Sequence, residues 1–158
     1  MWTYILLAIV IIVLICITSY FYIDWQVNKK IEQEHKERDA VEKRLTTSLK
    51  TLCAQLCIDL SYHKELGDAA GRILYHSMNG RLFVDDARIE ILEKYKDEPY
   101  TLAHELGHYM AIKQRQDSSE EGADTEADKL CRLILNDNEQ KLLAISLRCY
   151  FHQMEVVE

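Results

Sequence analysis

The distribution of charge along the chain is the feature that most constrains how it can fold. Residues 1–23 carry no charged side chain, so all 19 Lys and Arg and all 26 Asp and Glu lie in the rest of the 158-residue chain. An apolar N-terminal segment is therefore joined to a strongly polar body. A body of this length can bury one hydrophobic core, so we expect one globular domain after the segment.

Composition excludes several classes of protein. With 5 Gly and 1 Pro, the chain is neither collagen-like nor a flexible low-complexity protein. The net charge of −7 and the lack of a basic block argue against nucleic acid as the main partner. We therefore expect no nucleic-acid partner.

The uncharged stretch 4–23 has the length of a membrane-spanning helix. Its 20 residues cover about 30 Å at 1.5 Å per residue, the thickness of the hydrocarbon core of a bilayer. A cleaved signal peptide would need a basic start and a small-residue cleavage site, and a buried core helix would need a polar face. The flanking aromatic residues resemble interfacial belts: Trp2, Tyr4, Tyr20, Tyr22 and Trp25. The sequence predicts a retained single-pass transmembrane helix over residues 1–23.

Positive charges beside this stretch predict its orientation. No Lys or Arg precedes it, whereas six follow it closely: Lys29, Lys30, Lys36, Arg38, Lys43 and Arg44. By the positive-inside rule, we expect the C-terminal body to lie in the cytoplasm. The four cysteines of the body lie in apolar patterns rather than in a disulfide framework, which agrees with a reducing compartment.

The first half of the body combines helical and strand patterns. Residues 24–40 are mostly charged, which indicates a juxtamembrane linker or a solvated helix. Apolar residues then recur at helical spacing, which predicts an amphipathic helix over about 39–62. Asn79-Gly80 between two apolar runs is typical of a β-hairpin turn, and 87–93 is either a short strand or the start of a helix.

Three further helices are predicted in the C-terminal half. Glu98-Pro99 begins one that runs to about Gln114. Ser118 and Glu121 form a capping-box pattern that begins another, and a last helix covers about 138–152. The predicted fold class is α+β, with a small domain over 41–158 made of several helices and a short β-hairpin or sheet.

The motif that carries chemistry lies in the first of these helices. His104-Glu105-Leu106-Gly107-His108 places two histidines four residues apart on one helical face, close enough to hold one Zn²⁺. Glu105 points to the adjacent edge, where a carboxylate can take a proton from metal-bound water. Gly107 destabilises a helix by about 1 kcal/mol, and close approach of another element would explain it.

A catalytic zinc usually keeps three protein ligands, and the next helix supplies acidic candidates. A short turn makes the two helices antiparallel neighbours, so position 108 faces about 124 and position 104 faces about 128. We therefore expect Asp124 as the third ligand and Asp128 as the carboxylate that hydrogen-bonds a ligating histidine. Glu126 and Glu120 stay open as alternative ligands.

These two segments resemble a known family. Thr101-Leu-Ala-His-Glu-Leu-Gly-His-Tyr109 and Asp124-Thr-Glu-Ala-Asp-Lys-Leu130 look like the gluzincin-type zinc peptidases, and most like the small ImmA/IrrE-type metallopeptidases. The likeness covers about 41–135 and implies a zincin-like fold. By position it makes Asp124 the ligand, although the family commonly has Glu there, and Asp128 the residue behind it. The family's Phe-Ala and terminal Leu-Pro are missing, as is the helix-turn-helix that members often carry.

The resemblance implies hydrolysis of a peptide bond in a protein, often a regulatory one. We therefore expect a membrane-anchored, cytoplasm-facing zinc endopeptidase of narrow specificity, with Glu105 as general base. The segment Leu82–Val84 is a candidate for pairing with an extended substrate. Four residues are candidates to stabilise the oxyanion: Tyr75, His76, Tyr100 and Tyr109. The alternative is an inactive membrane-tethered domain that binds zinc or another protein through its helices.

Overall fold

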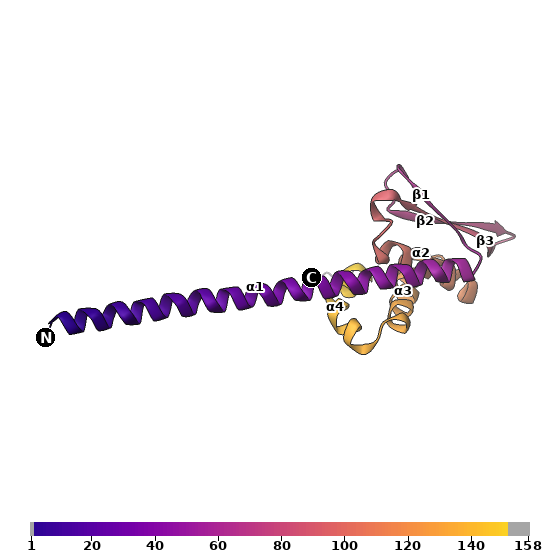
Figure 1. Ribbon diagram of the computed structural model, residues 1–158. Helices are drawn as coiled ribbons and strands as arrows, with labels where there is room; N and C mark the ends of the chain where they lie inside the picture. The colour runs from indigo at the N-terminus through magenta and orange to yellow at the C-terminus, as the bar shows by residue number, and fades with distance from the viewer. Residues whose placement is uncertain (1, 152–158) are drawn as a thin grey trace, which may run out of the picture. The chain divides into compact units, whose positions relative to one another are not determined.

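The computed structural model describes the backbone of residues 2–151 and the side chains of residues 14–151. Contacts divide the chain into two units, residues 1–39 and 40–158. Within the described residues the fold is α+β (Figure 1). Its elements in chain order are α1 (Trp2–Gln55), β1 (Asp59–His63), β2 (Gly71–Met78), β3 (Arg81–Leu92), the 3₁₀ helix η1 (Glu93–Tyr95), α2 (Pro99–Arg115), α3 (Glu120–Ile134) and α4 (Asp137–Phe151).

The first unit consists of the N-terminal part of α1. Every side chain from residue 14 to residue 37 is exposed. Pairs of charged or polar side chains four residues apart support the helix, such as Lys36 with Glu32 at 2.6 Å and Gln33 with Glu37 at 2.9 Å. Of the two possibilities for residues 24–40, a linker or a solvated helix, the structure has the helix.

The predicted transmembrane helix at residues 1–23 is corrected by the structure. Within the described residues, no helix has the length and apolar character needed to cross a bilayer. The uncharged side chains that the structure describes cover only residues 14–23, about 15 Å of helix, or half the hydrocarbon thickness. The earlier part of the predicted span, residues 1–13, lies outside the described side chains. The predicted single-pass membrane localisation depended on this span and is withdrawn with it.

The sheet has the strand order β1-β3-β2, with β1 parallel and β2 antiparallel to β3. The predicted hairpin is confirmed, because Asn79 and Gly80 both have positive φ, 53° and 75°, as a type I′ turn requires. The ambiguous segment 87–93 is mainly strand, since β3 continues to Leu92. The predicted helix over 39–62 is too long, because α1 ends at Gln55 and β1 follows it; Cys57, with φ 57°, lies in the turn between them.

β1 pairs with only part of β3, and the side chain of Gln116 takes the place of a strand at one residue of the rest. β1 pairs with β3 only from Arg88 to Leu92. Ahead of that segment, the backbone N–H of Leu82 donates to Gln116 Oε1 at 2.7 Å, and Gln116 Nε2 donates to Leu82 O at 3.1 Å. Gln116 is the left-handed cap at the end of α2, and one amide side chain thus occupies both backbone groups of a strand residue.

The three C-terminal helices agree with the sequence prediction, apart from one cap. α2 begins with Pro99 at its first position, as predicted, and α4 begins within one residue of the expected start. α3 is capped by Ser119, whose Oγ accepts from the N–H of Gly122 at 3.0 Å. The predicted capping box of Ser118 and Glu121 is therefore wrong by one residue.

The hydrophobic core fills the space between the sheet, the end of α1 and the three C-terminal helices. Leu49 of α1, Ile89 of β3, Leu106 of α2, Cys131 of α3 and Leu147 of α4 are all fully buried in it. Because every element of the second unit contributes, the helix that carries the two histidines is held on several sides.

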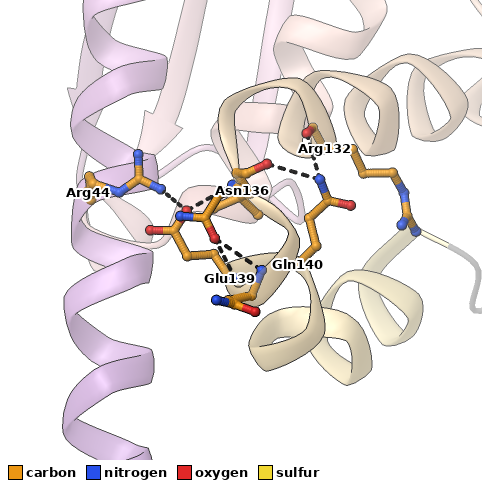
Figure 2. A network of polar contacts seen from close by, with 7 residues as sticks. Arg44, Arg132, Asn136, Glu139 and Gln140 are labelled. Atoms are coloured by element: carbon orange, nitrogen blue, oxygen red, sulfur yellow. Dashed lines mark hydrogen bonds and ion pairs between the residues drawn. The ribbon is translucent and has the colours of Figure 1, made fainter.

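A polar network fixes the start of α4 against α1 and the end of α3 (Figure 2). Asn136 Oδ1 accepts from the N–H of Glu139 at 3.1 Å, while Glu139 Oε2 accepts from the N–H of Asn136 at 2.9 Å, which is a capping box. Arg44 of α1 donates to the same carboxylate of Glu139. Gln140 Nε2 donates to the backbone oxygen of Arg132 at 2.9 Å. The network therefore holds α4 at its first turn.

Candidate metal centre

α2 places the two histidines of the motif one above the other. The ring centroids of His104 and His108 are 4.8 Å apart, and the rings are nearly perpendicular. Their side chains are 19% and 11% exposed, so both sit at the border between core and solvent. Both face α3, as two residues on one helical face must when a second helix packs there.

Gly107 allows α3 to approach this face closely. A Cβ atom added at Gly107 would lie 2.1 Å from the backbone oxygen of Ala123 and 3.1 Å from the Cβ of Ala127. No side chain fits into that space, so the glycine is required by packing despite its low helix propensity. The close approach that the sequence suggested for Gly107 is confirmed, and it places the start of α3 beside the histidines.

Glu120 is the carboxylate that meets both histidines. Its Oε2 lies 3.0 Å from Nε2 of His104 and 3.6 Å from Nε2 of His108. The three ligand atoms all lie within 4.8 Å of one another. In a tetrahedral zinc site with bonds of about 2.0–2.1 Å, ligand atoms are about 3.4 Å apart. Two imidazoles and one carboxylate grouped in this way could hold a metal ion, with the Glu120 side chain, which is 79% exposed, on the solvent side.

Asp124 contacts the other nitrogen of His104. Its Oδ1 lies 2.8 Å from His104 Nδ1 and can accept the N–H of that nitrogen. This bond fixes the tautomer and leaves Nε2 available on the side of Glu120. Asp124 thus lies where Asp128 was expected. Glu120, which was one of the alternative ligands, lies where Asp124 was expected.

Asp128 and Glu126 lie next to basic side chains. Asp128 Oδ2 accepts from Arg132 Nε at 2.8 Å. Glu126 accepts from Lys129 at 2.9 Å and lies 3.2 Å from Arg115. The carboxylates that lie next to the histidines are thus 120 and 124 rather than the expected 124 and 128.

Glu105 is a buried carboxylate next to the histidines. It is 5% exposed, and its Oε1 lies where a Cβ at Gly71 of β2 would come within 3.0 Å. Burial raises the pKa of Glu105 to about 7; His104 opposes this shift, Glu120 adds to it, and a backbone hydrogen bond from Ile73 opposes it. A carboxyl group in this range can accept and return a proton near neutral pH.

Burial also lowers the pKa of His108, and the charge of His104 acts in the same direction. Both effects favour the neutral imidazole of His108. Because a metal binds the neutral ring, the environment of His108 favours the form that a cation needs.

A cleft of about 430 Å³ opens beside His104 and Glu105. The other residues that line it are Ala70 and Gly71 at the start of β2, Thr101 of α2, Asp124 of α3 and Tyr150 of α4. Polar side chains of three helices therefore meet at one concave surface, which is the usual form of a binding site.

The structure changes two expectations about this cleft. Leu82–Val84 lies in the part of β3 that β1 leaves uncovered, but it does not line this cleft, and the edge strand that borders the cleft is β2. None of the four oxyanion candidates lines the cleft: Tyr75 and His76 are exposed on β2, Tyr100 donates to Glu42, and Tyr109 accepts from Lys113.

Tyr150 does line the cleft and was not singled out from the sequence. Its hydroxyl lies 2.8 Å from Thr101 Oγ1, and its ring stacks on that of Tyr100 with centroids 5.3 Å apart. The sequence predicted the last helix, but it contained no sign that this helix reaches the cleft.

Comparisons with known proteins give no match for this chain: no protein-family model, no curated protein and no solved structure matches it. The resemblance to the ImmA/IrrE-type metallopeptidases therefore depends on residues 101–109 and 124–130 alone. The interpretation of the site depends on the geometry described above.

Proposed function

We propose that this protein is a zinc-dependent endopeptidase whose ion is held by His104, His108 and Glu120, with Glu105 as the general base. The observation that carries the proposal is the convergence of Glu120 on Nε2 of both histidines. Glu105 takes no part in that group and instead lies buried in the wall of the adjoining cleft. A ligand set and a separate buried carboxylate are the two parts that metal-assisted hydrolysis needs.

When Zn²⁺ is bound, it supplies Lewis acidity, which polarises a peptide carbonyl and lowers the pKa of water. Asp124 holds the ring of His104 in the orientation that directs Nε2 at the ion. Glu105 takes one proton from the water whose oxygen attacks the carbonyl carbon. It then returns that proton to the amide nitrogen as the carbon–nitrogen bond breaks.

The position of β2 supports an extended peptide as substrate. β2 is an edge strand, Gly71 at its start lines the cleft, and the N–H of Ile73 reaches Glu105. A peptide in extended conformation can add to such an edge through its own backbone. The substrate is therefore an exposed or unfolded segment of a protein. The substrate is one regulatory protein or a few, because a peptidase that cut many proteins would damage its own cell.

The rival function is a domain in which the ion, or plain packing, only joins α2 to α3. Glu105 favours the peptidase over this rival. Glu105 is 5% exposed and lies outside the ligand set, and burying a carboxylate destabilises the fold because it costs solvation energy. A catalytic role would explain why such a residue is present. A purely structural centre has no need of a cleft beside it.

The experiment compares the zinc-loaded full chain with its Glu105→Gln variant on a mixture of unstructured peptides, read by mass spectrometry. We expect the wild type to cut a restricted subset. The variant should bind zinc equally and cut at least about 100-fold more slowly, since general-base catalysis contributes about 10²–10⁴. Glu121→Gln is the matched control, because Glu121 is an exposed acid on the first turn of α3.

Three results would contradict the proposal. They are a wild-type chain that retains no zinc, a zinc-loaded wild type that cuts no peptide, and a Glu105→Gln variant that cuts as fast as wild type. Zinc with a closed set of four protein ligands would support the structural rival.

A further inference from the structure

α4 contributes a hydroxyl group to the cleft. Tyr150, near the end of this helix, lines the cleft together with His104 and Glu105. No part of the proposed mechanism so far uses it, although a phenol at the border of a reaction site is a donor that peptide hydrolysis can use. The inference below rests on the proposed function and extends it.

The hydrogen bonds around Tyr150 fix the direction of its proton. Thr101 has one hydroxyl proton and donates it to Oε2 of Glu98 at 2.8 Å. The 2.8 Å contact between Thr101 Oγ1 and the hydroxyl of Tyr150 is therefore donated by Tyr150. Its acceptor is a neutral hydroxyl, which binds a donor less strongly than a charged oxygen does. Rotation about the C–O bond redirects the proton when a better acceptor enters the cleft.

Two aromatic rings hold the ring of Tyr150 in place. It stacks on Tyr100 and meets Phe151 edge-on with centroids 5.4 Å apart. The far end of α4 is fixed by the capping box and by Arg44, as Figure 2 shows. A donor that is already in position loses little entropy when it acts, which is the condition for effective charge stabilisation. Burial also raises the pKa of Tyr150, so its hydroxyl keeps its proton at neutral pH.

We propose that Tyr150 is a catalytic residue whose hydroxyl donates a hydrogen bond to the oxygen of the scissile carbonyl as that oxygen becomes negative. When the water oxygen bonds to the carbonyl carbon, the π electron pair moves onto the carbonyl oxygen and the water proton goes to Glu105. Tyr150 keeps its own proton throughout. When the carbon–nitrogen bond breaks, the pair returns to the carbonyl and the hydrogen bond relaxes to Thr101.

The test is the zinc-loaded full chain carrying Tyr150→Phe, measured on a peptide that the wild type cuts. We expect kcat to fall about 100-fold while KM stays within about 3-fold, because one lost oxyanion donor typically reduces kcat by 10²–10³. Zinc content and melting temperature should be unchanged, since the ring and its stacking remain. Tyr109→Phe is the matched control, because it removes another buried tyrosine hydroxyl whose partner, Lys113, lies outside the cleft.

A second measurement keeps the inference testable if the variant is less stable. A phosphinic analogue of the same peptide carries a charged oxygen where the oxyanion develops, and it should bind Tyr150→Phe about 100-fold more weakly. The parent peptide should bind both proteins equally. If the wild type cuts but Tyr150→Phe cuts within 3-fold of it, or binds the analogue equally, this inference alone fails. If the wild type cuts nothing, the proposed function fails and this inference with it.

Discussion

The two halves of α3 carry the same kind of residue in different surroundings. In the first half, Glu120 and Asp124 face imidazole nitrogens across a distance set by Gly107. In the second half, Glu126 and Asp128 face Arg and Lys side chains. The carboxylates of the first half meet histidine nitrogens and belong to the proposed metal centre, whereas those of the second half are paired with basic side chains of the protein itself.

The difference shows that the place of an acid along α3, rather than its identity, decides what it can do. Glu120 and Asp124 lie on the face of α3 that meets the histidines. Glu126, which is as near to Ala123 along the chain as Glu120 is, meets Arg115 and Lys129 instead, and Asp128 meets Arg132.

Gly107→Ala should push α3 away from α2, so that Glu120 and Asp124 in the first half of α3 lose their contacts with the histidines. Its methyl group would lie 2.1 Å from the Ala123 oxygen, so α3 must move. Overpacking of this kind costs about 1–3 kcal/mol, and we expect about 3 because the obstacle is backbone. Thermal unfolding and zinc titration should both show the loss. Ala144→Ser, which adds one atom at an exposed helix position, should change neither, and a stable Gly107→Ala protein with normal zinc affinity would contradict the packing argument.

Glu120→Gln should weaken zinc binding more than about 100-fold, because it replaces a charged ligand. A change behind a ligand typically weakens metal binding 10–100-fold, so a ligand itself should exceed that range. Competition with a coloured chelator measures the affinity. Glu126→Gln is the counterpart in the second half and should leave zinc affinity within about 2-fold. Equal losses for the two variants would show that both halves supply ligands.

Asp124→Asn should weaken zinc binding by about 10–100-fold, the range for a carboxylate that orients a ligating histidine. The amide keeps the size of the side chain but lacks the charge that fixes His104 Nδ1–H. Asp128→Asn is the control, because Asp128 pairs with Arg132 rather than with a histidine, and it should leave zinc affinity unchanged. A larger effect of Asp128 than of Asp124 on zinc would restore the order first predicted from the sequence.

The free energy of unfolding should fall at high pH because of the thiol of Cys131, which lies on the buried face of the second half of α3. Burial, with a smaller contribution from Asp128, raises the pKa of Cys131 from 9.0 to about 12. Above pH 9 the unfolded chain loses this proton while the folded chain keeps it, so stability present below pH 9 is lost as the pH rises towards 12. The loss should be about 1.4 kcal/mol per pH unit. Urea unfolding between pH 8 and 11 measures it.

Cys131→Ala isolates this contribution from other groups that titrate in the same range. The variant should be less stable at every pH, because it leaves a cavity, but its stability should decline less steeply above pH 9. Parallel declines for wild type and variant would show that Cys131 is not in the apolar environment described here.

Much of the second unit follows from local chemistry in the sequence. Pro99 at the start of α2 and Asn79-Gly80 in the hairpin act through their own backbone preferences, so the pattern alone predicts them. The two histidines share a face for the same local reason. β1 was missed because its five residues follow α1 without a Gly or Pro and pair with a strand far along the chain.

The third ligand could not be derived in the same way. It depends on which side chains of α3 meet the histidines where the two helices pack, and the spacing within each helix does not determine this. The sequence indicated a close approach at Gly107, but not which carboxylates would reach the histidines. Tyr150 was missed for a related reason, since its place in the cleft depends on how α4 folds back onto α2. Non-local packing shifts such assignments by a whole helical turn while leaving each helix where it was predicted.

The amide of Gln116 has a consequence for the solution behaviour of the protein. An uncovered strand segment is a template onto which another chain can add a strand, and this is a common start of aggregation. By occupying both backbone groups of Leu82, Gln116 closes one residue of that template without the length of a further strand. A single side chain at a helix end thus shortens the strand edge with which another chain could pair.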